Sequence, residues 1–278
     1  MGQKLYLECY SGISGDMTVA ALLDLGADQK HLEVALSGLP VQGFRTEVSR
    51  VVKSGLDACD FSVILDQDNH DHDMEYLHGS EKSYTGHHEY THSHEYPHEH
   101  RGMKEITEII QKSEMTARAK KMAMRVFGIL AQAESKAHGV PVEEVHFHEV
   151  GAVDSIVDIA AIAICMDNLD ISNVIVPVLY EGTGFIRCQH GQIPVPVPAV
   201  THIAETHKLK LKITDIQGEL VTPTGAAVVA AFRTSDRLPE DFTMLKTGIG
   251  AGKRQYRCPG ILRAMLIRET TDLQIKDI

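Results

Sequence analysis

The stretch KLYLECYSGISGDMTVAALLDLG, from Lys4 to Gly26, decides the fold class. Its first seven residues, KLYLECY, predict a β-strand, and SGISGD (Ser11–Asp16) predicts a turn of small residues. The following MTVAALLDL predicts a helix that Gly26 ends. A strand that leads directly into an apolar helix is typical of proteins that combine helices with a sheet. We therefore expect a mixed α/β fold.

Further elements follow on the carboxyl-terminal side of this stretch. A hairpin is expected around Ser54-Gly55, because the residues on both sides of it alternate between apolar and polar. Other patterns predict helices at 30–39, 103–111, 115–137, 152–166 and 198–206 and after Thr222-Pro223, and strands at 174–178, at 209–213 and on both sides of GIGAGKRQYRCPG. We expect one globular domain over residues 1–278, interrupted by a flexible insertion at 67–101.

The insertion is rich in histidine: nine of the sixteen histidines of the chain lie between His70 and His100. It has almost no aliphatic residues, so folding it would not bury enough apolar surface to offset the loss of chain entropy. A tract of this composition typically binds metal, and neutral imidazole suits nickel, copper and zinc. The alternative is a solvated loop without a ligand. The candidate metal ligands here are His70, His72, His87, His88, His92, His94, His98 and His100.

Charge and composition narrow the classes of partner. The net charge of −11 argues against nucleic acid, which basic faces bind. We find neither a signal peptide nor an apolar run long enough to span a membrane. The five cysteines are scattered, and no Cys-x-x-Cys motif occurs, as in reduced cytosolic proteins. We expect a cytoplasmic protein that handles cations or small molecules and leave open whether it is a homo-oligomer.

A second polar cluster lies in VEEVHFHEVGAVDSIVDI (142–159). It contains His146, His148, Glu149, Asp154 and Asp158, and the two aspartates are one helical turn apart. Two histidines and three carboxylates can bind a divalent cation or transfer protons, so these five are our candidate catalytic residues, and the two histidines are further candidate metal ligands. The structural alternative is helix capping, because Ser155 and Asp158 have capping-box spacing and Asp154 can cap alone.

Two turns are candidate anion sites because each opens a helix. Residues Ser11, Gly12, Ser14, Gly15 and Asp16 form the first, and Thr222, Thr224 and Gly225 the second; at both, ordinary capping is the alternative. The segment GIGAGKR (248–254) lacks the spacing of a phosphate-binding P-loop. Its Lys253 and Arg254 either clamp an anionic ligand or lie in a solvated turn.

Six segments in this order resemble the LarC family of nickel-insertion proteins: CYSGISGDMTVAALLDLG, the His-rich insertion, EVHFHEVGAVDSIVDI, GQIPVPVPAV, ELVTPTGAA and GIGAGKR. The similarity covers nearly all of Lys4 to Arg268. The resemblance implies insertion of nickel into a pyridinium mononucleotide with two thiocarboxylates, which yields the nickel-pincer cofactor of lactate racemase. It also implies a chelatase of the lyase class that uses CTP with manganese or magnesium.

One departure from the family concerns length. Family members usually continue for well over a hundred further residues, which implies that nucleotide binding belongs to a carboxyl-terminal half and that this half is a partner of the present chain. A nickel store or metallochaperone without catalysis of its own is the alternative function. The candidate ligands, base and phosphate sites named above follow from residue types, and the resemblance itself does not assign them.

Overall fold

The computed structural model describes residues 2–66, 101–145, 147, 153–188 and 191–270. The helices and strands, in chain order, are β1 (Gln3–Glu8), α1 (Gly15–Asp24), α2 (Gln29–Ser37), β2 (Phe44–Lys53), β3 (Leu56–Leu65), α4 (Met103–Lys112), α5 (Ala117–His138), η2 (Val142–Glu144), α6 (Val153–Asn168), β4 (Ile171–Ile175), β5 (Leu179–Thr183), β6 (Phe185–Cys188), β7 (Gly191–Pro194), α7 (Pro198–His207), β8 (Leu211–Gln217), α8 (Pro223–Phe232), β9 (Phe242–Ala251) and β10 (Ile261–Glu269). The predicted mixed α/β fold is confirmed.

A six-stranded mixed sheet forms the framework, in the order β2-β3-β9-β10-β1-β4. Strand β1 runs antiparallel to β10 and parallel to β4, so the first strand of the chain lies inside the sheet. The hairpin β2–β3 joins the opposite edge through a parallel pairing of Cys59 with Gly250. Its turn is where we expected it, and Ser54 and Gly55 both have positive φ, as a two-residue hairpin turn requires.

Helix α1 lies directly on strand β9, and two glycines make this contact possible. A Cβ atom on Gly248 would collide with the backbone of Ala21 and Leu25, and one on Gly250 with the backbone of Met17. Both glycines lie within β9, whereas we expected GIGA to begin the loop after the strand. Glycine within a strand often marks the close approach of another backbone, as it does here.

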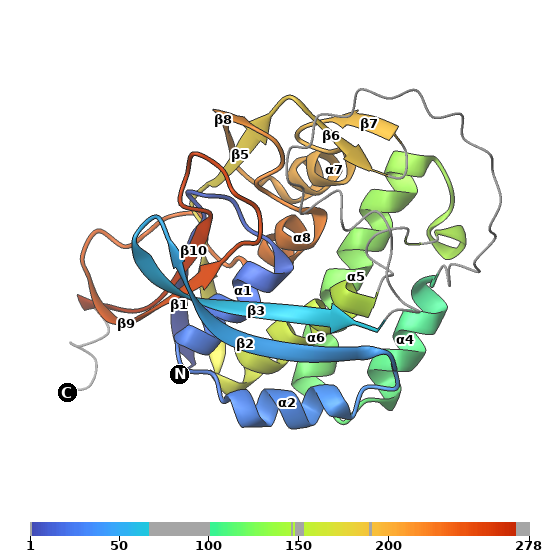
Figure 1. The fold of residues 1–278 in the computed structure, drawn as a ribbon, viewed down its shortest axis with the longest axis horizontal. Coiled ribbons are helices and arrows are strands. Elements are labelled where there is room, and N and C mark those ends of the chain that lie inside the picture. The colour runs from blue at the N-terminus through green and yellow to red at the C-terminus, as the bar shows by residue number, and fades with distance from the viewer. Residues whose placement is uncertain (1, 67–100, 146, 148–152, 189–190, 271–278) are drawn as a thin grey trace.

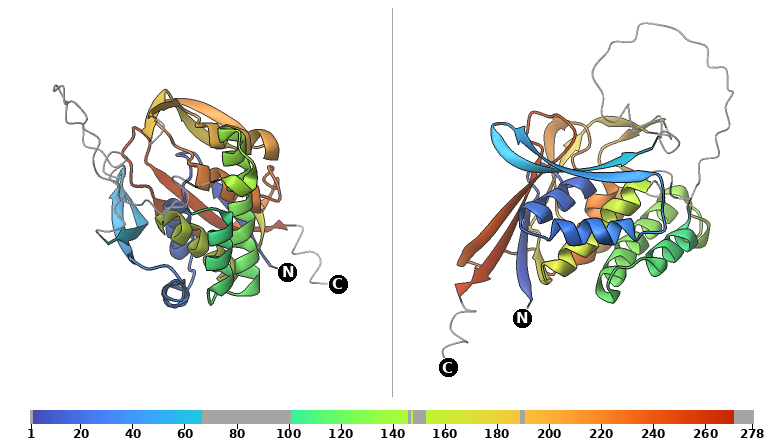
Figure 2. Two further views of the ribbon diagram at one scale, coloured as in Figure 1. Left: turned by 90° about the vertical axis from the view of Figure 1, so that its right-hand side faces the viewer. Right: turned by 60° about the horizontal axis from the view of Figure 1, so that its bottom comes forward.

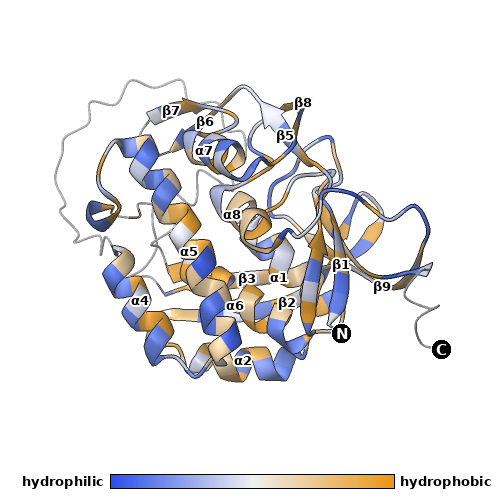
Figure 3. Ribbon diagram, turned by 180° about the vertical axis from the view of Figure 1, so that it is seen from behind, coloured by the Kyte–Doolittle hydropathy of each residue, from blue (hydrophilic) through white to orange (hydrophobic). Residues whose placement is uncertain are grey.

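The remaining helices stack outward from α1 (Figure 2). Helix α6 packs on α1, α5 packs on α6, and α7 and α8 pack on α5. Helix α6 carries buried apolar residues on most of its surface, which agrees with its central place. The other face of the sheet has a smaller apolar cluster formed by Tyr6, Ile175, Met265 and Ile267. Figure 3 shows that polar residues dominate the outward faces of α2, α4 and α5.

Two small sheets lie at the end of the molecule away from α2. Strands β5 and β8 pair in parallel, and β6 and β7 form a hairpin (Figure 1). We predicted β8 but not β5, β6 or β7. The loop between β9 and β10 and the segment that leaves β1 reach the same end of the molecule. None of the helices in the described part of the chain is long and apolar enough to cross a membrane.

Candidate functional site

The predicted histidine ligands fall outside the described residues. This holds for His70, His72, His87, His88, His92, His94, His98 and His100, and also for His146, His148 and Glu149. The residues beside them are described. Arg101 follows the His-rich segment, and its carbonyl oxygen accepts a hydrogen bond of 3.2 Å from the N–H of Phe147. Phe147 is buried. The carboxyl end of the His-rich segment is thus joined to the segment that carries His146 and His148.

The two predicted aspartates lie near the start of α6. Helix α6 is already formed at Val153, so Ser155 and Asp158 are inside the helix and do not form the capping box that we considered. Asp154 accepts the N–H of Ser155 at 2.8 Å. Asp158 serves another helix: its carboxylate accepts the backbone N–H of Asp16, in the first turn of α1. The Ser14 side chain does not cap α1, and Asp158 takes over part of that function from a neighbouring helix.

Asp16 and Asp158 form a pair of carboxyl groups at this junction. Gly15 allows the close approach, because a Cβ atom there would collide with the Asp158 carboxylate. Burial raises the pKa of Asp158 well above its ordinary value, and the charges of Asp16 and Asp154 raise it further. Burial also raises the pKa of Asp16, although a hydrogen bond from the Ser14 hydroxyl and the charge of Lys253 oppose the shift. The pair therefore holds a proton more strongly than two exposed aspartates would.

The raised pKa values predict a pH dependence of stability. A carboxyl group whose folded pKa exceeds its unfolded value stabilises the native state at low pH. In the unfolded chain the pKa of an aspartate is near its ordinary value of 3.8. The stabilisation is therefore complete below about pH 4 and is lost as the pH rises through the raised pKa of the folded state. Asp158→Asn lacks the titrating group but keeps an oxygen for the N–H of Asp16. As the pH rises, we expect the free energy of unfolding of the wild type to fall relative to that of the variant.

Chemical denaturation at several pH values above about 4 tests this prediction. If the free energy of unfolding depends on pH in the same way for both proteins, the prediction is wrong.

The two predicted anion sites lie side by side. The backbone N–H of Ile13 donates to Leu220 at 3.0 Å, and its carbonyl oxygen accepts from Thr222 at 3.1 Å. Because of these bonds, α1 and α8 begin next to each other, and both positive helix ends face one region. Thr222 caps α8 by accepting the N–H of Gly225, as in the capping alternative. In the first turn, protein acceptors already bind the N–H groups of Gly12, Ile13 and Asp16.

A buried carboxylate that we did not predict fixes the second turn. Glu181 in β5 has no exposed surface, and its Oε1 accepts the N–H groups of Gly182, Leu220 and Val221 at 2.7, 2.8 and 3.2 Å. Burial raises the pKa of Glu181. Arg254 holds the same turn from the other side through the carbonyl and carboxylate oxygens of Glu219. Glu181 and Arg254 therefore fix the position of the turn that precedes α8.

Lys253 faces the candidate site and is not a solvated turn residue. Its ammonium group donates to Asp60 Oδ1 at 2.5 Å and to Ser62 Oγ at 2.7 Å, and its charge favours the ionised forms of Asp16 and Asp158. We did not predict Asp60 or Ser62. Their spacing of two places both on one face of β3, but nothing in the local sequence indicates that Lys253 meets them. The GIGAGKR segment thus supplies Lys253 to the carboxyl pair and Arg254 to the turn before α8.

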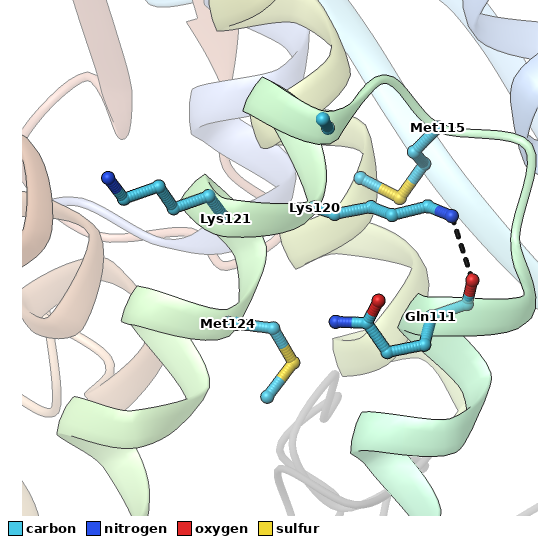
Figure 4. Close-up of a pocket in the computed structure, with 6 residues that line it drawn as sticks. Gln111, Met115, Lys120, Lys121 and Met124 are labelled. Carbon is cyan, nitrogen blue, oxygen red and sulfur yellow. Dashed lines mark hydrogen bonds between the residues drawn. The ribbon is translucent and has the colours of Figure 1, made fainter.

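No group of three or more His, Cys, Asp or Glu side chains is arranged to hold a metal ion within the described ranges. A shallow pocket lies between α4 and α5, where Lys120 donates to the carbonyl oxygen of Gln111 at 2.8 Å (Figure 4). Methionine, alanine, glutamine and lysine side chains line it, and none of the predicted site residues does. The predicted site residues that the structure brings together lie instead at the junction of α1, α6 and α8.

Comparison with known proteins identifies the family of this chain. The chain belongs to the nickel insertion protein family, whose characteristic pattern matches residues 5–278. Relatives named pyridinium-3,5-bisthiocarboxylic acid mononucleotide nickel insertion protein occur in Alkaliphilus metalliredigens, with 48% identity over 100% of this chain and 63% of the relative, and in Acetivibrio thermocellus, with 37% identity over 94% of this chain and 60% of the relative. A third, in Clostridium acetobutylicum, is 41% identical over 98% of this chain and 66% of its own length.

The chain spans less than two thirds of the length of these curated relatives. No solved structure matches it. The expected membership in a nickel-insertion family is confirmed, and nickel is the metal that the family handles.

Proposed function

We propose that this chain is the nickel-binding and substrate-holding part of a nickel chelatase. Its proposed substrate is pyridinium-3,5-bisthiocarboxylic acid mononucleotide, which the names of the relatives contain. Its proposed product, which follows from the family resemblance, is the nickel-pincer cofactor used by lactate racemase. The reaction joins nickel to two sulfurs and a ring carbon, and soft sulfur ligands suit nickel. As the carbon–nickel bond forms, the carbon–hydrogen bond breaks, and a base must accept the proton.

The carboxyl pair Asp16–Asp158 is the observation that carries this proposal. A carboxyl group is a stronger base when its pKa is raised, and burial raises the pKa of both Asp16 and Asp158. The charge of Lys253 opposes the rise and favours the ionised forms of both groups. A store that only binds nickel has no need of a partly buried carboxyl pair joined to a helix start. His146, His148, Glu149 and Asp154 remain candidates for nickel delivery and proton transfer.

The phosphate of the substrate is assigned to the paired starts of α1 and α8. Because the N–H groups of Gly12, Ile13 and Asp16 are engaged, an anion would bind at Ser14 and Gly15 in the first turn. Thr224 is the corresponding residue of the second turn. Nickel would arrive from the His-rich segment, whose following residue Arg101 is hydrogen-bonded to Phe147 between the two candidate histidines.

Nickel insertion is expected to need a second half and CTP. GIGAGKR forms the end of β9 and a turn held by ion pairs, and it offers no phosphate-binding loop. The purified chain should bind nickel and the dithiolated mononucleotide but should show weak affinity for CTP with manganese or magnesium. Addition of the carboxyl-terminal half of a relative, with CTP, should start turnover. Tight CTP binding or full turnover by the chain alone would overturn the assignment of CTP binding to a carboxyl-terminal half. Nickel binding without turnover under any condition would favour a nickel store or metallochaperone.

A further inference from the structure

Two tyrosines stand on the outer face of the small sheet beside the candidate phosphate site. The segment after β1 lies next to β5, where Cys9 pairs with Leu179 and the N–H of Tyr180 donates to the Cys9 carbonyl oxygen at 3.2 Å. Side chains alternate between the faces of a strand. Cys9, Leu179 and Glu181 are accordingly buried, while 51% of Tyr10 is exposed. The face that carries Tyr10 and Tyr180 is turned away from the core.

The two rings and a lysine form an ordered group. The centroids of the Tyr10 and Tyr180 rings are 4.8 Å apart, and their planes are inclined by 49°. Tyr180 is paired in register with Lys212 of β8. The Lys212 ammonium group lies 4.7 Å from the centroid of the Tyr180 ring and donates to its hydroxyl at 3.2 Å. Tyr180 is therefore next to both the exposed ring of Tyr10 and an exposed cation.

This combination suits one class of ligand. The face of a tyrosine ring attracts a cation, and flat aromatic rings stack on it. An ammonium group beside it binds a carboxylate, thiocarboxylate or phosphate. A pyridinium mononucleotide has a flat cationic ring and anionic substituents. The local lysine matters because the chain as a whole, with a net charge of −11, repels anions.

We propose that Tyr10 and Tyr180 are the platform for the pyridinium ring of the substrate and that Lys212 pairs with an anionic group on it. The proposal rests on the proposed function and concerns where the ring binds before insertion; for the proton transfer the ring must pass from this platform to the carboxyl pair Asp16–Asp158. Tyr10 directly precedes the turn 11–16, to which the substrate phosphate is assigned. Glu181, behind the platform, fixes the turn 219–221 and so connects the platform with the start of α8.

Calorimetry with nicotinic acid mononucleotide tests the platform, and ribose 5-phosphate, which lacks the ring, is the matched ligand. The wild type should bind the mononucleotide more tightly than the sugar phosphate. Tyr10→Leu should weaken mononucleotide binding about tenfold, the size of a cation–π contact, and leave ribose 5-phosphate binding unchanged. Tyr10→Phe keeps a ring and should stay within about threefold of wild type. Lys212→Met should weaken the binding of both ligands if Lys212 contacts the phosphate, and of the mononucleotide alone if it contacts the carboxylate on the ring. Phe185→Leu, at an aromatic residue that is 63% exposed on β6, is the control.

Tyrosine fluorescence gives a second readout, because the chain has no tryptophan and a stacked pyridinium ring should quench Tyr10 and Tyr180. Equal mononucleotide binding by wild type and Tyr10→Leu would overturn the platform and leave the proposed function intact. If Tyr10→Leu reduces the affinity for both ligands equally, the platform is also overturned, because Tyr10 would then not recognise the ring. A wild type that binds no mononucleotide would overturn the proposed function and the platform together.

Discussion

Replacing residues 67–100 by a short Gly/Ser linker should remove more than one nickel ion per chain and leave thermal unfolding nearly unchanged. The segment contains nine histidines and lacks the apolar residues that would contribute to a core. The contacts on both sides of it persist in the variant: Asp66 donates to Gly43 at 2.9 Å, and Arg101 accepts from Phe147. Equilibrium dialysis with nickel and a thermal melt are the two measurements.

A matched variant separates the histidines from the length of the segment. Substituting all nine histidines by glutamine keeps the number of residues and should lose nickel to the same extent as the linker variant. If either variant binds as much nickel as the wild type, the metal is held elsewhere. If the linker variant is insoluble, the segment contributes to folding, and the composition argument is wrong.

Asp158→Asn should lower the rate of nickel insertion about 100-fold in the assay with the carboxyl-terminal half and CTP, which is the lower end of what a general base contributes. The amide cannot accept the ring proton. Its oxygen can still accept the N–H of Asp16, so α1 should begin as before and the fold should persist. Single-turnover measurement of cofactor formation, with circular dichroism as the check on folding, gives the result.

Asp167→Asn is the matched control, since Asp167 lies at the other end of α6 and binds Thr116 and Arg118 at the surface. It should insert nickel at the wild-type rate. An Asp158→Asn variant with wild-type activity would leave Asp158 with a capping role only and would move the search for the base to His146, His148 and Glu149.

Local patterns sufficed for most of the fold. The hairpin at Ser54-Gly55, the end of α5 at the left-handed Gly139 and the start of α8 at Thr222 were predictable because neighbouring residues determine each of them. Strand β5 was not, because LYEGT contains a charged residue and a glycine that normally disfavour a buried strand. Glu181 is accepted there because N–H groups from a turn about forty residues later bind it.

The candidate site, like strand β5, depends on contacts between residues that are far apart in the sequence. Asp158 was a candidate from its place in an apolar helix, but its partner Asp16 lies more than a hundred residues earlier in the chain. The glycines of GIGA looked like a loop, and only their contact with α1 explains why they belong to a strand. Lys253 meets Asp60 across a similar distance in sequence. Residue types made these groups candidates, whereas the fold was needed to show which of them meet.

The hydrogen bond between Arg101 and Phe147 has a kinetic consequence. His98 and His100 precede Arg101 by three residues and one residue, and three residues of chain reach at most about 10 Å. If these histidines bind nickel as proposed, the ion would be tethered within that length of the segment 146–148. Its effective concentration there is on the order of millimolar, far above that of free nickel in dilute solution. With nickel bound there, its transfer to a substrate already held by the chain would be unimolecular, and the rate of that transfer would no longer follow the concentration of free metal.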